Sequence, residues 1–211
     1  SYKHVDGTTP NNSFDRLSFL GKATHMIHPK VKLEASMAFA NSTPKNSPIN
    51  LGENFANGVW GRSYDPSTAK DKYKGSHGGL ANSKYGDEWG NMPGKDTWWN
   101  VYENEFRQKE TSVRPNVKLN IDLLDWLKFN VEGSYNYYYT RYEEKKPGSG
   151  YANEGGYYGL SQTTKEQSNL NANFMFNKTF GDFTVNGFIR GEYYENFQQA
   201  QSMNTNGGLI A

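Results

Sequence analysis

The histidines are the residues of this 211-residue chain best suited to acid–base or metal chemistry, and there are four of them. His25 and His28 bracket a proline turn, so a metal held there would need further ligands from elsewhere in the fold. The chain has no cysteine, which excludes disulfides, thiolate nucleophiles and cysteine-ligated metals. No serine stands in a G-x-S-x-G elbow, where a nucleophile would be exposed. The sequence therefore predicts a protein that is not an enzyme.

Acidic side chains in the first long polar stretch offer oxygen ligands of the kind that Ca²⁺ prefers. The candidates are Asp65, Asp71, Asp87 and Glu88. Their spacing does not match an EF-hand loop, and a long loop is a place where a bound ion would serve as a staple. Ca²⁺ is the one cofactor that the sequence leaves open.

Aromatic side chains are concentrated in the same stretch. The candidates for contact with a ligand or with a covering partner are Trp60, Tyr85, Trp89, Trp98 and Trp99. Flat rings stack on sugar faces, but they also pack a loop against itself, so packing is the alternative for each of them. Long loops are usually functional or disordered, and tryptophan-rich ones are rarely disordered, so we expect this one to be ordered.

These residues must be positioned by three two-strand units, which the apolar alternation places at about 16–40, 113–139 and 168–194. The apolar face is predicted to carry Val31, Leu33, Met37, Phe129, Val131, Leu170, Phe174 and Phe176. The polar face is predicted to carry Asn116, Asn120, Asn130, Asn136, Asn169, Asn171, Asn173 and Asn177.

Strand length and loop length indicate how such a sheet is used. Each of the six strands has about 9 to 13 residues, against about 5 to 6 in soluble proteins and about 9 to 11 for a tilted membrane strand. Turns within the units are short, whereas long connections occupy 41–110 and 140–167. The sequence predicts an all-β fold, an antiparallel transmembrane β-barrel segment with short periplasmic turns and long extracellular loops. Tyr135, Tyr137 and Tyr139 would lie at the interface near the long loops.

Composition limits the other classes of protein to which the chain could belong. With 23 basic and 22 acidic side chains the net charge is +1, which provides no field for binding nucleic acid. No apolar run approaches the roughly 20 residues of a transmembrane helix. No signal peptide is recognised. The alternative to a membrane segment is a soluble, secreted β-sandwich with a carbohydrate-binding or adhesin role, in which the apolar faces would be internal.

Several short motifs, in order and spacing, resemble the SusC/RagA family. They are Trp98-Trp99-Asn100-Val101-Tyr102-Glu103-Asn104, Leu124-Asp125-Trp126-Leu127-Lys128-Phe129, Gly155-Gly156-Tyr157-Tyr158, Asn169-Leu170-Asn171-Ala172 and Lys178-Thr179-Phe180. The resemblance implies a TonB-dependent importer of oligosaccharides or peptides in the cell outer membrane of Gram-negative, Bacteroidota-like bacteria. It also implies a SusD-like surface lipoprotein as partner and outer-membrane lipid as surroundings.

The chain departs from that family in extent. Such transporters have barrels of roughly 22 strands around a plugged lumen, whereas six strands are predicted here and no part of 1–211 predicts a plug domain. We therefore expect residues 1–211 to form a partial TonB-dependent receptor barrel. TonB would act through the missing plug.

Overall fold

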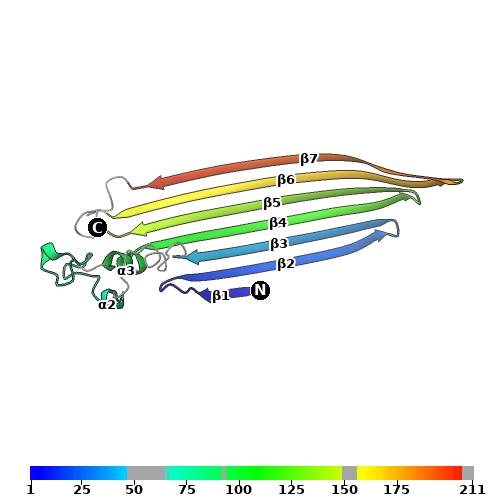
Figure 1. The fold of residues 1–211 in the computed structure, drawn as a ribbon. Helices are drawn as coiled ribbons and strands as arrows, with labels where there is room; N and C mark the ends of the chain where they lie inside the picture. Colours follow the sequence, from blue (N-terminus) through cyan, green and yellow to red (C-terminus); the bar gives the residue numbers. More distant parts are fainter. Residues whose placement is uncertain (47–64, 66, 92–93, 149–155, 206–211) are drawn as a thin grey trace.

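The chain forms one antiparallel β-sheet in a computed structural model, which describes residues 1–46, 65, 67–91, 94–148 and 156–205 (Figure 1). The strands are β1 (Tyr2–Asp6), β2 (Ser13–His28), β3 (Val31–Lys45), β4 (Glu105–Leu124), β5 (Leu127–Lys146), β6 (Tyr157–Phe180) and β7 (Phe183–Asn204). Each strand pairs with the next along the chain, in the order β1-β2-β3-β4-β5-β6-β7. The three predicted two-strand units are therefore confirmed as β2–β3, β4–β5 and β6–β7.

The register places the predicted apolar positions in common rows. Leu33 lies opposite Leu119, Leu119 opposite Val131, and Val131 opposite Ala172. In the next row towards the short turns, Phe129 lies opposite Phe174, with ring centroids 4.5 Å apart. Because residues directly opposite each other share a face, these rows form one apolar face across four strands.

The opposite face is polar along the same rows. Asn120 lies opposite Asn130, which lies opposite Asn173. Side-chain hydrogen bonds cross the strands here, for example from Asn116 Nδ2 to Glu132 Oε1 at 2.8 Å. Amide and charged side chains thus form cross-strand hydrogen bonds on a surface suited to water.

The strands are longer than the sequence predicts. The connection predicted at 140–167 is shorter than predicted, because β5 continues to Lys146 and β6 begins at Tyr157. The loop predicted at 41–110 is likewise shortened by β3, which ends at Lys45, and by β4, which begins at Glu105. Beyond the apolar rows both faces are polar, so the apolar alternation stops although the backbone pairing continues. The sequence analysis also missed the short strand β1, which has no such alternation.

The strands of the three hairpins are longer than a hydrocarbon layer is thick. β5 has 20 residues. At about 3.4 Å per residue and about 45° of tilt, that is roughly 48 Å along a membrane normal, against about 30 Å of hydrocarbon. The strand ends extend well beyond an apolar band.

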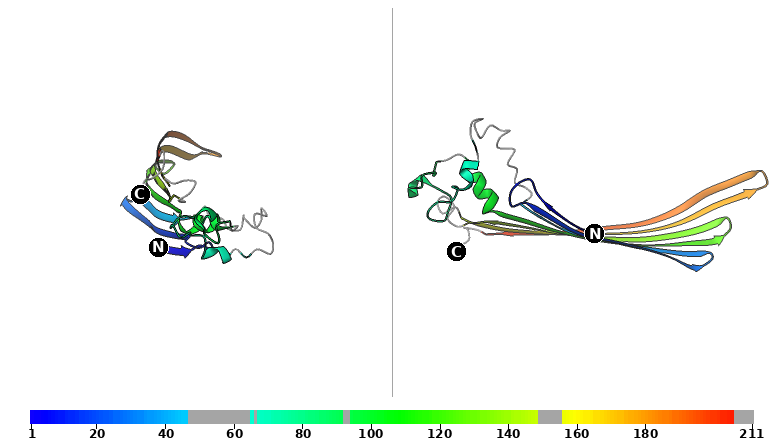
Figure 2. Two further views of the ribbon diagram at one scale, coloured as in Figure 1. Left: turned by 90° about the vertical axis from the view of Figure 1, so that its left-hand side faces the viewer. Right: turned by 90° about the horizontal axis from the view of Figure 1, so that it is seen from below.

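The two ends of the sheet differ. The short turns of all three hairpins lie at one end, and helices α2 (Ser67–Lys70) and α3 (Lys95–Tyr102) lie at the other (Figure 1). Figure 2 shows the sheet curved across its strands, like a piece of cylinder wall. The predicted asymmetry of short turns and long connections is confirmed. Among the described residues neither α-helix is long or apolar enough to cross a membrane.

The β-sandwich alternative is wrong for the described residues. All seven strands belong to one sheet, so no second sheet covers the apolar face. Phe19 is 61% exposed and Ile189 71% exposed, and Leu170 and Phe174 on the same face are also exposed. A soluble sandwich would bury such side chains.

Asn46 joins three elements where the long connection leaves β3. Its side chain is 1% exposed and accepts a hydrogen bond from Phe106 N at 2.8 Å while donating one to Asn11 O at 2.9 Å. Its backbone has a φ of 54°, a left-handed conformation that asparagine and glycine tolerate better than other residues. Asn46 thus ties the β1–β2 connection and the start of β4 to the end of β3.

Replacing Asn46 by alanine should destabilise this end of the sheet. The variant removes the partner of the part-buried Phe106 N–H and of the part-buried Asn11 carbonyl, which should lower the free energy of unfolding by up to about 1 to 3 kcal/mol for each unsatisfied group. The measurement is thermal unfolding of the full-length protein in detergent. Asn46→Gly is the comparison, because glycine accepts the positive φ and so isolates the hydrogen-bond contribution. An Asn46→Gly protein as stable as the wild type would contradict this role.

Candidate binding surface at the long-loop end

The connection between β3 and β4 carries its own small core. Ala69 and Val101 are fully buried, and Trp98 is 7% exposed. Tyr102 stacks against Trp98 with ring centroids 5.9 Å apart, and Tyr73 stacks on Tyr102 at 5.8 Å. This packing of α3 against α2 gives the described residues 67–91 and 94–104 a core of their own, in line with the order that the sequence predicts for a tryptophan-rich segment.

Local signals explain why α3 forms where it does. Gly94 precedes the helix with a φ of 84°, a conformation that favours glycine, and Asp96 lies in the first turn, where the helix dipole stabilises a negative charge. Trp98, Trp99 and Val101 then provide the buried side of a short helix. Glu103 N closes the last turn by donating to Trp99 O at 2.8 Å.

The aromatic candidates for ligand or partner contact are placed differently from one another. Trp98 and Trp99, which is 6% exposed, lie in the interior of the segment, so packing accounts for their positions. Trp89 is half-buried, with Lys72 Nζ 3.7 Å from its ring centroid. Tyr85 is 47% exposed and is the candidate best placed for an external contact. Trp60 lies outside the described residues.

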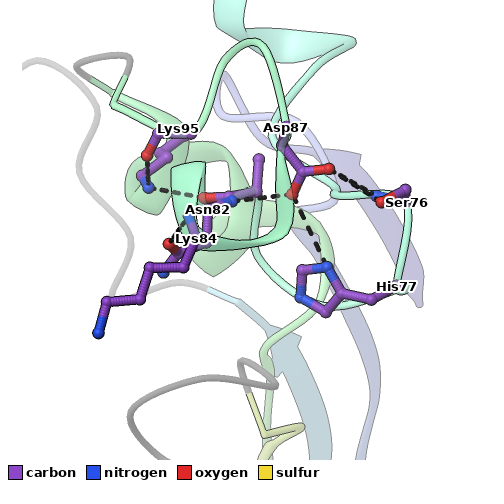
Figure 3. Close-up of polar contacts among 8 residues, drawn as sticks. Ser76, His77, Asn82, Lys84, Asp87 and Lys95 are labelled. Carbon is purple, nitrogen blue, oxygen red and sulfur yellow. Dashed lines mark hydrogen bonds and ion pairs between the residues drawn. The ribbon is translucent and has the colours of Figure 1, made fainter.

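Asp87 organises the loop on which Tyr85 stands (Figure 3). Its carboxylate accepts hydrogen bonds from Asn82 N at 2.9 Å, from Ser76 N at 3.0 Å and from Ser76 Oγ at 3.0 Å. His77 Nδ1 lies 3.7 Å from the carboxylate, and the His77 ring packs on Tyr85 with centroids 4.2 Å apart. The backbone N–H donors, Asn82 first and then Ser76, lower the pKa of Asp87 below its ordinary value of 3.8.

The acidic residues considered for Ca²⁺ are not brought together. In the part of the chain that the structure describes, no group of three or more His, Cys, Asp or Glu side chains gathers as metal ligands would. Asp65 accepts a hydrogen bond from Ser67 N at 2.9 Å, and both Asp87 oxygens are engaged by protein donors. Asp71 and Glu88 are exposed. The structure gives Asp65 and Asp87 roles in holding the backbone.

A hollow of about 380 Å³ lies on the polar face, in the part of the strands nearest the long connections. One ladder row crosses it, with Ser42 opposite both Arg16 and Glu110, Glu110 opposite Thr140, and Thr140 opposite Thr163. The next row adds Ser112, Tyr138 and Lys165. Hydroxyl groups therefore line the hollow, with a cation towards each side and a carboxylate between them.

The side chains of this hollow are suited to binding a polar ligand. Its lining includes no histidine and no cysteine, and its charged groups are one acid and two bases on different strands. Such a surface hydrogen-bonds a polar chain and pairs with groups of either charge. The sequence analysis missed it because Thr140, Thr163 and Lys165 fall in a stretch predicted to be a loop; their hydroxyl-rich alternation was the available signal.

Solved structures of a peptide transporter share this fold. Over 93% of the chain, the fold matches a chain in the structure of the RagAB peptide transporter, with a TM-score of 0.60 and 14% identity. A second match, to the RagAB peptide importer in the "closed-closed" state, covers 94% of the chain with a TM-score of 0.61 and 15% identity. The chain spans 22% of the length of each of these. No family model and no curated protein matches the sequence.

This likeness shows the fold alone, an antiparallel β-barrel segment. It agrees with the SusC/RagA resemblance carried by the motifs between Trp98 and Phe180.

Acid should loosen the segment around Tyr85. Because the pKa of Asp87 is lower in the folded protein, its stabilising effect is present above pH about 4, the ordinary pKa of an aspartate, and is lost as the pH falls through the lower folded value. Tryptophan fluorescence of the full-length protein, titrated from neutral to acid pH, should report this transition.

Asp87→Asn is the matched variant for that titration. Its amide directs N–H groups towards the Asn82 or Ser76 donors, so the segment should already be loosened at neutral pH and its acid transition should be lost. A variant that keeps the wild-type transition would assign that transition to another group.

Proposed function

We propose that this chain is part of the barrel wall of an outer-membrane importer. The observation that carries the proposal is the single sheet with one apolar face and one polar face on strands long enough to cross a bilayer with residues to spare. In hydrocarbon every backbone N–H and C=O must be paired, which a closed barrel achieves. Among the described residues β7 pairs only with β6, so its other edge would meet a further strand of the parent protein.

In this arrangement the apolar face contacts outer-membrane lipid and the polar face lines the interior. The neighbouring structures are of a transporter, which supports a role in transport rather than catalysis. The SusC/RagA resemblance adds a SusD-like lipoprotein as the surface partner and TonB as the source of energy through a plug. The exposed Tyr85, on the loop held by Asp87, is the contact that we assign to that lipoprotein or to cargo.

Peptides are the cargo that the polar hollow suits better. Arg16 and Lys165 would pair with carboxylates, and Glu110 with an ammonium group, whereas a neutral oligosaccharide has no group that needs these charges. The neighbouring structures are those of a peptide transporter and a peptide importer. Oligosaccharide cargo is the second candidate, supported by the hydroxyl-rich lining of the same hollow.

Lys165→Gln tests the cargo assignment. Loss of a charge-assisted hydrogen bond worth about 1.5 to 3 kcal/mol should weaken binding of acidic peptides roughly 10- to 100-fold, measured by calorimetry with the full-length protein. Lys22→Gln is the control, since Lys22 occupies the same face outside the hollow. Binding of neutral oligosaccharides that exceeds binding of peptides would favour the second candidate.

Phe174→Arg tests the orientation of the sheet. An arginine on the lipid side of the apolar band should raise the free energy of membrane assembly, by about 2 to 4 kcal/mol at the midplane and less near the interfaces, and should reduce the amount of heat-resistant barrel assembled in the outer membrane. Asn173→Arg is the matched control, because Asn173 is the next residue and lies on the opposite face. Equal assembly of both variants would argue against the membrane placement.

A further inference from the structure

A second hollow lies on the other side of the ladder, above the apolar face and at the long-loop end. Its volume is about 480 Å³, and its charged lining consists of four bases and two acids: Lys45, Arg107, Lys109, Arg141, Asp15 and Glu143. The strand period places these side chains on the same face as Leu33 and Val131, further along the same strands.

The four bases face one another as like charges. Lys45 lies opposite Arg107 in the β3–β4 ladder, and Lys109 lies opposite Arg141 in the β4–β5 ladder. Like charges directly opposite each other destabilise a sheet, because their Cβ atoms are only about 5 Å apart. Two such pairs side by side form a place where an anion would be stabilising.

Nearby acids neutralise that place only in part. Arg107 Nε pairs with Glu105, and Arg107 lies opposite Glu143 in the β4–β5 ladder. Asp15 Oδ1 already accepts hydrogen bonds from Tyr2 OH at 2.6 Å and His4 Nδ1 at 2.7 Å. Glu143 accepts one from Tyr158 OH at 2.9 Å, and its other oxygen is 3.8 Å from Arg141 Nη2.

Arg141 itself has an open donor. Its Nε is shielded from solvent and has no hydrogen-bond partner among the described residues. A planar guanidinium presents Nε and an Nη as a fork that fits two oxygens of a phosphate.

The depth of the hollow identifies the source of the anion. Arg141 follows Tyr139, the last of three tyrosines on the apolar face, by two residues. That is about 7 Å along the strand and about 5 Å along the normal at about 45° of tilt, within the headgroup layer of roughly 5 to 7 Å. Lysines and arginines at this depth attract anionic lipids, at about 1 kcal/mol for each cation.

We infer that the side chains of Lys45, Arg107, Lys109 and Arg141 bind the phosphate of an anionic lipid headgroup in the leaflet at the long-loop end. The inference rests on the membrane placement proposed above. The Arg141 guanidinium would hold two phosphate oxygens, and Lys109 and the Lys45–Arg107 pair would neutralise the remaining charge. The bound lipid would relieve the like-charge repulsion between β3, β4 and β5.

Native mass spectrometry of the full-length protein in detergent tests this inference. The probes are phosphatidylglycerol, phosphatidylcholine and inorganic phosphate. Wild-type protein should retain phosphatidylglycerol in preference to phosphatidylcholine, and Lys109→Gln/Arg141→Gln should weaken that retention roughly 30-fold, from two cations at about fivefold each. Arg114→Gln/Lys118→Gln is the control, because it removes one arginine and one lysine from the polar face of β4.

The outcomes separate the inference from the proposed function. Equal retention of both lipids, or no effect of the Lys109/Arg141 double variant, overturns the inference while the protein still assembles in the membrane. Displacement of phosphatidylglycerol by millimolar inorganic phosphate overturns the assignment to a lipid. A protein that does not reach the membrane at all overturns both.

Discussion

The antiparallel hydrogen-bond ladder from β2 to β7 is the constraint on which the rest of the structure depends. In hydrocarbon no water can satisfy a backbone N–H or C=O, so the pairing must continue row after row. Because side chains alternate with a period of two, this register also fixes which side chains share a face. A shift of one residue between β4 and β5 would place Leu119 and Asn130 on one face and lose both surfaces.

Beyond the apolar rows, the same ladder places the two hollows on opposite faces of the sheet. Glu110 and Thr140 line the hollow on the polar face. Their chain neighbours Lys109 and Arg141 line the second hollow, on the face that carries the apolar rows. In the proposed membrane placement, this pair of adjacent strands would present the cargo contacts to the barrel interior and the phosphate contacts to the lipid. Both hollows lie on strand ends that extend beyond the apolar rows.

The segment between β3 and β4 depends on packing rather than on the ladder. Trp98 and Val101 of α3 cover Ala69 of α2. Part-buried hydrogen bonds, from Asn82 N to Asp87 and from Lys95 Nζ to Ala81 O at 2.6 Å, hold the loop between the two helices (Figure 3). Asn11, in the β1–β2 connection, ties this segment to the sheet by donating from Nδ2 to Val101 O at 3.1 Å. A rigid support of this kind leaves Tyr85 exposed in a defined position, as a surface contact requires.

The sequence by itself determined the centre of the sheet. Alternation such as Leu170, Ala172 and Phe174 against Asn169, Asn171 and Asn173 requires one apolar and one polar face, so three hairpins and their facing were predictable. The ends of the strands were not, because the stretch from Thr140 to Lys146 is polar on both faces and only its partners show that it is a strand. Only the tertiary structure brings together the residues that line the two hollows. Lys109 and Arg141, or Ser42, Glu110 and Thr163, are far apart in sequence and become neighbours only through the register of the ladder.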